Sequence, residues 1–371
     1  MFYPIALSML LLVYGYGSWR LLAYLPTPWS ALGTVTVCAL ALSPLLAARM
    51  REHPTFRRLG DAYCWVAYGG LGFFVVLTSL FLLRDLVGIA LELSDIVLPF
   101  PHNLLDAATL GLSVLSASWG FYQARRTPAV RRVTVPIDGL PAELDGLRIA
   151  QISDLHVGPT IKGDFVRRIV ERTNALQPDI IVFTGDMADG PVERLAEDVA
   201  PLQELRAPLG LFSITGNHEY YSGVHDWIAQ AERLGFRVLL NDSCQIEHLG
   251  AHIAIVGITD HSAGGMLADH RSDPQGALDR APQADLVVLL AHQPRSVFSA
   301  RGAHLQLSGH THGGQFIPWK YIVPLQQTYL AGLHRHESTW LYVHSGSGYW
   351  GPPLRLGAPS EIALLVLSKT Q

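Results

Sequence analysis

The sequence has few charged residues for its length. Only 16% of its 371 residues are Asp, Glu, Lys or Arg, whereas about a quarter is usual for soluble domains. The mean hydropathy is +0.24, which is high for a protein that is soluble along its whole length. The chain is also longer than one average domain, so we expect two structural units.

Cysteine is scarce, and the sequence has no internal repeat and no low-complexity segment. The three cysteines, Cys38, Cys64 and Cys244, have neither the spacing of a metal site nor the even number that a disulfide framework needs. A disulfide scaffold and a cysteine-based metal site are therefore excluded.

Basic residues are in the minority after residue 132. This second part has 17 Lys and Arg against 25 Asp and Glu, whereas the first 132 residues have 10 against 6. A net acidic domain argues against nucleic acid as a partner. Fourteen of the sixteen histidines also lie after residue 132, so we expect the chemistry of the protein to be in its second part.

Four apolar runs in the first third are each long enough to cross a bilayer core of about 30 Å, which takes about 20 residues. They are Ile5–Leu25, Trp29–Ala48, Ala62–Leu83 and Leu104–Gln123. We therefore predict a four-helix transmembrane domain over residues 1–126. The stretch after the third run, Arg84–Pro101, is either an amphipathic helix on the membrane surface or an extension of that span.

Arginines cluster after the second and the fourth apolar run. They are Arg49, Arg51, Arg57 and Arg58, and then Arg125, Arg126, Arg131 and Arg132. Segments rich in Lys and Arg face the cytoplasm. We predict an integral protein of the cell (inner) membrane with its second domain in the cytoplasm. One miscounted span would place that domain on the other side.

From Val133 onward, short apolar runs rich in β-branched residues alternate with amphipathic stretches. "LRIAQISD", "DIIVFTGD" and "ADLVVLLAH" read as strands, several of them buried on both faces, whereas "DFVRRIVERTNAL" and "HDWIAQAERLG" have helical spacing. This alternation predicts stacked sheets flanked by helices. We assign residues 127–146 to a linker and entry strand, and residues 147–371 to the α/β domain.

Five of the predicted strands end in residue types that bind metals. The residues are Asp154 and His156, Asp186, Asn217 and His218, His292, and His310 and His312. In α/β sheets, sites form where the carboxyl ends of strands meet loops. We therefore expect these side chains to converge on one pocket.

The spacing within two of these motifs supports convergence. Asp154 with His156, and His310 with His312, are pairs at i and i+2, whose side chains point the same way in an extended or turn segment. Nitrogen ligands mixed with carboxylates and an amide oxygen suit divalent metals such as Mn, Fe, Zn or Co. Two metals roughly 3.5–4 Å apart that share Asp186 would use all seven candidate ligands. Close approach is allowed by Gly309, Gly313 and Gly314.

These motifs resemble those of the calcineurin-like metallophosphoesterase superfamily, over Val133–Gln371. The matching blocks are Asp154-Leu-His156, Gly185-Asp186, Gly216-Asn217-His218-Glu219, His292 and Gly309-His310-Thr311-His312. Glu219 stands where many members have Asp. The C-terminal sequence is similar to a membrane-attached, YkuE/YaeI-like branch, which includes a transmembrane protein with a metallophosphoesterase domain.

The resemblance implies a four-layer αββα fold, in which a two-sheet β-sandwich is flanked by helices, and a dinuclear metal centre. It implies one metal held by Asp154, His156, Asp186 and His312, and a second held by Asp186, Asn217, His292 and His310. His218 would be the catalytic residue, a non-ligand that meets the phosphate and the leaving group, and we expect Glu219 to orient it. The metals would be Mn, Zn or Fe.

We therefore expect a membrane-bound phosphoesterase that hydrolyses a phosphodiester or pyrophosphate bond by a metal-activated hydroxide. The four spans beside the ligand set favour an amphiphilic, lipid-linked substrate and a lipid bilayer as partner. Two alternatives stay open, namely an esterase on soluble substrates that is merely anchored by its spans, and a non-catalytic binding scaffold.

Overall fold

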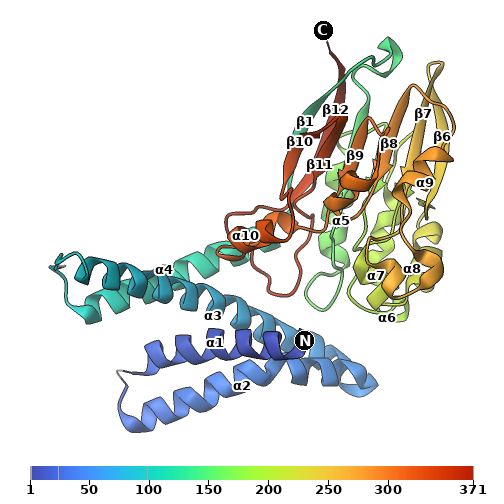
Figure 1. The fold of residues 1–371 in the computed structure, drawn as a ribbon. Helices are drawn as coiled ribbons and strands as arrows, with labels where there is room; N and C mark the ends of the chain where they lie inside the picture. Colours follow the sequence, from blue (N-terminus) through green and yellow to red (C-terminus); the bar gives the residue numbers. More distant parts are fainter. Residues whose placement is uncertain (1, 24, 98, 371) are drawn as a thin grey trace. The chain divides into compact units, whose positions relative to one another are not determined.

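The chain divides into a helical unit and an α/β unit in the computed structural model, which describes residues 2–23, 25–97 and 99–370 (Figure 1). The helical unit contains Met1–Gln123 and Gly351–Leu356, and the α/β unit contains Ala124–Trp350 and Gly357–Gln371. A short segment near the C-terminus thus belongs to the helical unit, which the sequence did not indicate.

Long helices build the helical unit. They are α1 (Phe2–Leu22), α2 (Thr27–Glu52), α3 (Arg57–Glu92) and α4 (His102–Arg125). Within the described residues, α2, α3 and α4 are long and apolar enough to cross a membrane. The sequence predicted four spans. The first, Ile5–Leu25, forms α1, but this helix is not among the three, and part of that predicted span lies outside the described residues.

Helix α3 is longer than a single span requires. Its 36 residues extend about 54 Å at 1.5 Å per residue, against a bilayer core of about 30 Å. The residues from Arg84 to Glu92 continue this helix. Of the two alternatives for the stretch Arg84–Pro101, extension of the third span is therefore correct for its first half.

Asp85 of α3 is surrounded by hydrogen-bond donors. Its carboxylate accepts from the Tyr16 hydroxyl, from the Arg20 guanidinium and from Arg84 Nη1 at 2.6 Å. Arg84 also pairs with Asp106 at the start of α4. Two arginines and two carboxylates thus neutralise one another in an apolar environment, where an unpaired charge is costly.

We expect Arg84→Ala to lower the thermal unfolding temperature of the purified protein in detergent by several degrees. The substitution removes the ion-pair partner of Asp106 and one of the two arginines that pair with Asp85, so that Arg20 alone faces two part-buried carboxylates. Arg49→Ala is the matched control, because Arg49 pairs with Glu52 on an exposed surface. Equal unfolding temperatures for the two variants would contradict a stabilising role for the network.

Two six-stranded mixed sheets form the centre of the α/β unit. The first has the order β1 (Ala129–Ile137), β12 (Glu361–Lys369), β2 (Arg148–Ile152), β3 (Ile180–Phe183), β4 (Leu211–Ser213), β5 (Arg237–Val238). The second has the order β10 (Gly332–His336), β11 (Thr339–Val343), β9 (Leu305–Ser308), β8 (Leu286–Leu290), β7 (Ala251–Gly257), β6 (Asp242–His248). Strands β2 to β5 are mutually parallel, as are β7, β8, β9 and β11.

Helices cover the outer faces of both sheets. On the first sheet they are α5 (Gly163–Asn174), α6 (Val192–Val199) and α8 (Val224–Arg233), and on the second α9 (Pro274–Asp279). Two short helices, α7 (Asn217–Tyr221) and α10 (Trp319–Ile322), lie in the connections after β4 and β9. Along β3, Ile180 and Val182 join the core between the sheets, whereas Ile181 and Phe183 pack with α5 and α8. This period of two explains why the strand is apolar throughout. The predicted four-layer αββα fold is confirmed.

Candidate metal centre

Loops from both sheets supply the polar residues of the site. Asp154 and His156 follow β2, Asp186 follows β3, and Asn217 and His218 follow β4 at the start of α7. The second sheet supplies His292 after β8, and His310 and His312 after β9. Because these strands run parallel within each sheet, their carboxyl ends lie at one edge. The structure brings all eight predicted site residues together there.

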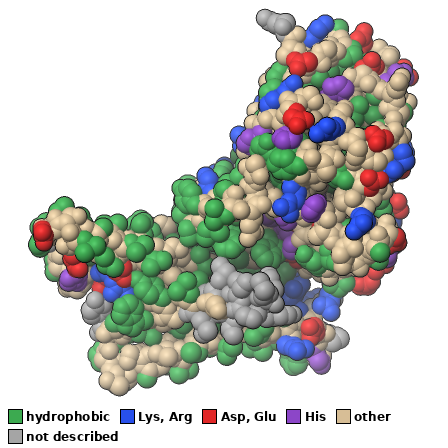
Figure 2. Space-filling model, viewed as in Figure 1, with side chains coloured by type: hydrophobic (Ala, Val, Ile, Leu, Met, Phe, Trp, Pro, Cys, Tyr) green, Lys and Arg blue, Asp and Glu red, His purple; other side chains and the backbone are tan. Residues whose placement is uncertain are grey.

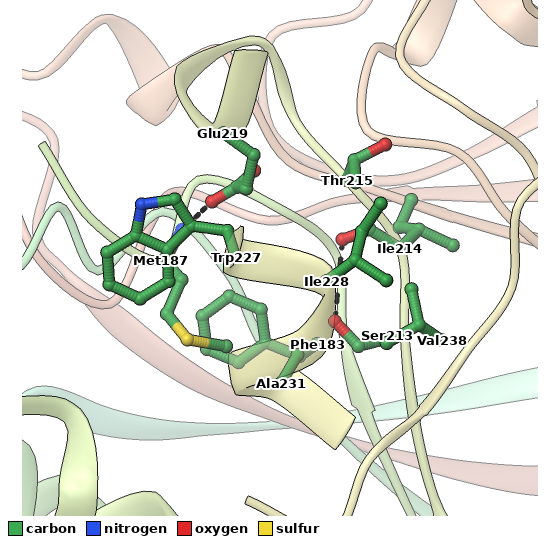
Figure 3. Close-up of a pocket in the computed structure, with 10 residues that line it drawn as sticks. All are labelled: Phe183, Met187, Ser213, Ile214, Thr215, Glu219, Trp227, Ile228, Ala231 and Val238. Atoms are coloured by element: carbon green, nitrogen blue, oxygen red, sulfur yellow. Dashed lines mark hydrogen bonds between the residues drawn. The ribbon is translucent and has the colours of Figure 1, made fainter. Parts of the chain in front are cut away.

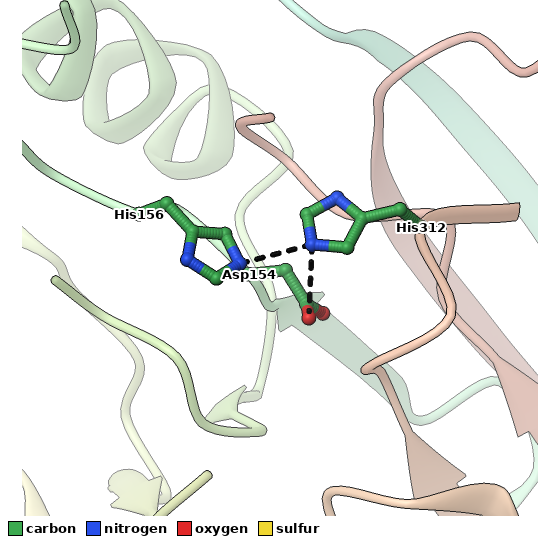
Figure 4. A group of neighbouring side chains, drawn as sticks. All are labelled: Asp154, His156 and His312. Carbon is green, nitrogen blue, oxygen red and sulfur yellow. Dashed lines mark hydrogen bonds and ion pairs between the residues drawn. The ribbon is translucent and has the colours of Figure 1, made fainter. Parts of the chain in front are cut away.

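The first group of side chains consists of Asp154, His156 and His312, all of them buried (Figure 4). Their ligand atoms lie within 4.8 Å of one another. The Nε2 atoms of His156 and His312 face each other at 2.9 Å, and His312 Nε2 lies 3.5 Å from Asp154 Oδ1. Asp186 Oδ2 is 3.7 Å from His156 Nε2, so this carboxylate reaches the group as well.

The second group of side chains consists of Asp186, His292 and His310, with Asn217 beside them. Asp186 Oδ2 lies 3.2 Å from His292 Nε2. The Asn217 amide oxygen lies 3.2 Å from His292 Nε2 and 3.1 Å from His310 Nδ1, and these two nitrogens are 3.3 Å apart. Asp186 therefore takes part in both groups.

Hydrogen bonds on the outer ring nitrogens show how two of the imidazoles are oriented. His292 Nδ1 lies 2.7 Å from the Thr184 carbonyl oxygen, which can only accept, so Nδ1 carries a proton. His156 Nδ1 likewise faces Asp189 Oδ1 at 2.9 Å. In both rings the Nε2 atom is the one that faces the group, as in metal-ligating histidines. This donor set fits divalent cations.

Buried carboxylates make the pocket attractive to positive charge. Burial alone lowers the pKa of His292, but the carboxylates of Asp186 and Asp154 raise that pKa well above its usual value. A divalent cation competes with this proton for the same nitrogen, so cation binding is coupled to proton release.

Comparison with known proteins also indicates a metal-dependent enzyme. The sequence profile of the family described as calcineurin-like phosphoesterase matches residues 147–314. An uncharacterized metallophosphoesterase of Helicobacter pylori is 39% identical over 266 residues, which cover 70% of each chain. This chain belongs to the calcineurin-like phosphoesterase family. It is a metal-dependent phosphoric ester hydrolase, as the resemblance predicted.

Relatives of this phosphoesterase include proteins of the predicted membrane-attached branch. The transmembrane protein with metallophosphoesterase domain of Bos taurus is 37% identical over 273 residues, which cover 70% of this chain and 61% of that protein. The uncharacterized metallophosphoesterase YkuE of Bacillus subtilis is 32% identical over 285 residues, which cover 73% of this chain and 97% of the relative. The predicted branch is thereby confirmed.

Asp189 is the site residue that sequence reasoning missed in this phosphoesterase. Its Oδ1 atom lies 2.6 Å from His218 Nδ1 and 2.9 Å from His156 Nδ1, so one carboxylate orients both rings. Burial lowers the pKa of His218, but Asp186 and Asp189 outweigh burial and raise that pKa to about 9. The signal in the sequence was a second aspartate three residues after Asp186, in "GDMAD".

Glu219 has a different role from the one we expected. Asp189, and not Glu219, is the carboxylate bonded to the His218 ring. The buried Glu219 carboxylate accepts backbone N–H groups of Gly216 at 2.6 Å, Met187 at 2.6 Å and Asp186 at 3.0 Å. It therefore ties the loop after β3 to the loop after β4. A cavity of about 10 Å³ behind Glu219, lined by apolar side chains that include Trp227 and Phe183, is far too small for a substrate (Figure 3).

The backbone of the site is strained at the ligand positions. Five site residues have positive φ between 50° and 72°, a region that non-glycine residues rarely adopt. They are Asp154, His156, Asp186, His310 and His312. Such strain costs on the order of 1–3 kcal/mol per residue and is found mainly at functional sites.

Glycine is required where two of these loops approach each other. A Cβ atom on Gly216 would lie 2.2 Å from Asp186 Oδ1, and one on Gly309 would lie 2.3 Å from Asp154 Oδ2. A side chain at either position would thus displace a carboxylate of the site.

We expect Asp189→Asn to lower kcat by about 10–100-fold, the usual effect of removing the acceptor behind a metal-site histidine. The substitution keeps the size of the side chain but removes the charge that orients His218 and raises its pKa. The measurement is steady-state hydrolysis of bis(p-nitrophenyl) phosphate with Mn²⁺. Asp164→Asn, at an exposed position of α5, is the control, and equal rates for the two variants would contradict the assigned role.

Proposed function

We propose that this membrane-attached phosphoesterase hydrolyses a phosphodiester or pyrophosphate bond of an amphiphilic substrate with two divalent metal ions. The proposal rests mainly on the convergence of four imidazoles, two carboxylates and the Asn217 amide in one buried pocket. The two buried carboxylates, Asp154 and Asp186, need compensating positive charge, since uncompensated buried charges are strongly destabilising. The helices long and apolar enough to cross a membrane support an amphiphilic substrate.

The ligand assignment follows the two groups of side chains. One cation would be held by Asp154, His156, Asp186 and His312, and the other by Asp186, Asn217, His292 and His310. When bound, divalent cations polarise phosphoryl oxygens and lower the pKa of the water that attacks phosphorus. Nitrogen-rich ligands with carboxylates suit Mn, Zn or Fe.

His218 is suited to the role of general acid. Its Nδ1 atom is bonded to Asp189, which leaves Nε2 to meet the substrate, and Nε2 lies 4.0 Å from Asp186 Oδ2 at the centre of the site. The carboxylates of Asp186 and Asp189 raise its pKa to about 9, which favours the protonated ring at neutral pH. It can therefore donate a proton to the departing ester oxygen, an effect worth about 10²–10⁴-fold in rate.

Backbone groups hold the carboxylates in place for this chemistry. Both oxygens of Asp154 accept the backbone N–H of His310, at 2.9 and 3.1 Å, and Asp186 Oδ1 accepts the backbone N–H of His218 at 2.9 Å. Asp154 is thus held by the loop that carries His310, and Asp186 by the loop that carries His218. Such preorganisation lowers the cost of reaching the transition state.

The arginine clusters support a cytoplasmic position for the catalytic domain, at the inner membrane. One cluster lies at the end of α2 and the start of α3, and the other runs from the last residue of α4 into β1. Two membrane helices separate these clusters, so both lie on the same side whether or not α1 also crosses the membrane. Segments rich in arginine face the cytoplasm.

We expect His218→Ala to lower kcat by about 10²–10⁴-fold while the protein retains its bound metal, because His218 is an acid and not a ligand. His310→Ala should instead lower the metal content along with the activity. The measurements are steady-state hydrolysis of bis(p-nitrophenyl) phosphate and metal analysis by mass spectrometry on the full-length protein in detergent. His252→Ala, at an exposed position of β7, should match the unmodified chain. Unchanged turnover in His218→Ala would favour a binding scaffold.

Removal of metal provides an independent test. Treatment with EDTA should abolish hydrolysis, and addition of Mn²⁺ or Zn²⁺ should restore it, since the proposed mechanism needs the cations held by the four imidazoles and two carboxylates. Activity that persists in protein shown to be free of metal would contradict the proposed mechanism.

A further inference from the structure

Two exposed aromatic rings stand beside the imidazole of His218. The Tyr221 ring centroid is 5.3 Å from that of His218, and the Trp350 centroid is 5.8 Å away, both in edge-to-face geometry. Tyr221 is 65% exposed and Trp350 is 55% exposed. Apolar surface is therefore available next to the group that meets the substrate.

Hydrogen bonds from Gln315 hold Trp350 in this position. The Gln315 amide donates to the Trp350 carbonyl oxygen at 2.9 Å, and its oxygen accepts the Trp350 backbone N–H at 2.9 Å. Gln315 is itself buried and follows the site residue His312 by three positions. The backbone of Trp350 is thus tied to the loop that carries the site.

The segment after Gln315 continues this apolar surface. Phe316 forms a β-bridge with Gly357, and Lys320 Nζ donates a hydrogen bond to the Gly357 carbonyl oxygen at 2.7 Å. The segment that begins at Phe316 is therefore held against Gly357. The large apolar side chains of this segment are exposed, and Leu325 is the most exposed of them at 83%. Figure 2 shows hydrophobic side chains gathered at the position of α10. We call the following exposed residues the apolar rim: Ile317, Trp319, Tyr321, Ile322, Leu325 and Trp350.

The charge of this region differs from that of the rest of the α/β unit. Residues 286–336 contain no Asp or Glu, although the chain after residue 132 is net acidic. Lys320 is the one charged residue between Phe316 and Leu330. A substrate with a negatively charged phosphoryl group and an apolar part would meet no carboxylate along the rim. Contiguous exposed apolar surface of this kind marks an interaction site.

We propose that the apolar rim binds the hydrocarbon chain of a lipid-linked phosphoester whose phosphoryl group lies at the metal centre. This inference rests on the proposed function and adds the residues that select the substrate. A lipid chain is favoured over a protein partner because Trp350 of the rim adjoins His218, and because the chain carries helices apolar enough to reside in lipid.

The experiment compares two phosphodiesters with the same leaving group, methyl p-nitrophenyl phosphate and octyl p-nitrophenyl phosphate. The full-length protein is held in phosphatidylcholine nanodiscs with Mn²⁺, and the octyl ester is kept below its micelle concentration. We expect kcat/KM to be at least about tenfold higher for the octyl ester, mainly through a lower KM, because burial of methylene groups is favourable.

Variants of the rim should lose this preference. Trp350→Ala, and separately Leu325→Ser at a position exposed enough to leave folding intact, should lower the octyl-to-methyl ratio of kcat/KM several-fold. Trp350→Phe should retain most of it. Leu249→Ala is the matched control, since Leu249 is 75% exposed at the turn between β6 and β7, and its ratio should equal that of the unmodified chain.

Three results would overturn the inference. The first is an unmodified chain that hydrolyses both esters with equal kcat/KM, which would leave metal-dependent phosphodiester hydrolysis standing but not the preference for an amphiphilic substrate. The second is a ratio unaffected by the rim variants, with a change of oligomeric state instead, which would make the rim a contact between copies. The third is no metal-dependent hydrolysis of either ester, which would overturn the proposed function as well.

Discussion

The rest of the site depends on the contacts that the Asp186 carboxylate makes with the surrounding imidazoles and backbone. Its Oδ2 atom lies within 3.2 Å of His292 Nε2 and within 3.7 Å of His156 Nε2, and its Oδ1 atom accepts the backbone N–H of His218. Burial raises its pKa, but the nearby imidazoles, His292 first, hold it well below its usual range. Two sheets meet at this one buried negative charge, so the positions of the histidines from the second sheet are set by a residue of the first.

Backbone contacts around Asp186 explain how such a charge is tolerated. Glu219 binds three N–H groups of the loops after β3 and β4, and glycine at position 216 lets those loops approach. The positive φ angles at ligand positions require further support from the surrounding packing, because strained backbone persists only where neighbours enforce it. A rigid polar centre beside an exposed apolar rim is the arrangement expected of an enzyme that acts on amphiphilic phosphoesters.

Much of the fold and the site could be predicted because each motif is a run of apolar strand residues followed directly by metal-binding residue types, and this pattern is visible in the sequence. Alternate residues of β2 and β3 pack into different cores, so both strands are apolar throughout and are recognised by β-branched residues. Asp189 was missed because an aspartate within a loop carries no periodic signal. Glu219 was misassigned because sequence proximity to His218 suggested contact, whereas its carboxylate turns toward backbone N–H groups. Three helices rather than four are counted as long and apolar enough to cross a membrane, because part of the first predicted span lies outside the described residues.

The sequence by itself determined the order of strands and helices, the apolar helices of the first part and the residue types available for a divalent metal site, since these depend on local periodicity and composition. Only the tertiary structure decided which nitrogen of His156 and His292 faces the site, which carboxylate orients His218, and that Trp350 stands beside it. These features arise from contacts between residues far apart in the chain, such as Thr184 with His292 and Gln315 with Trp350. Hydrogen-bond partners of this kind are fixed only when the two sheets pack together.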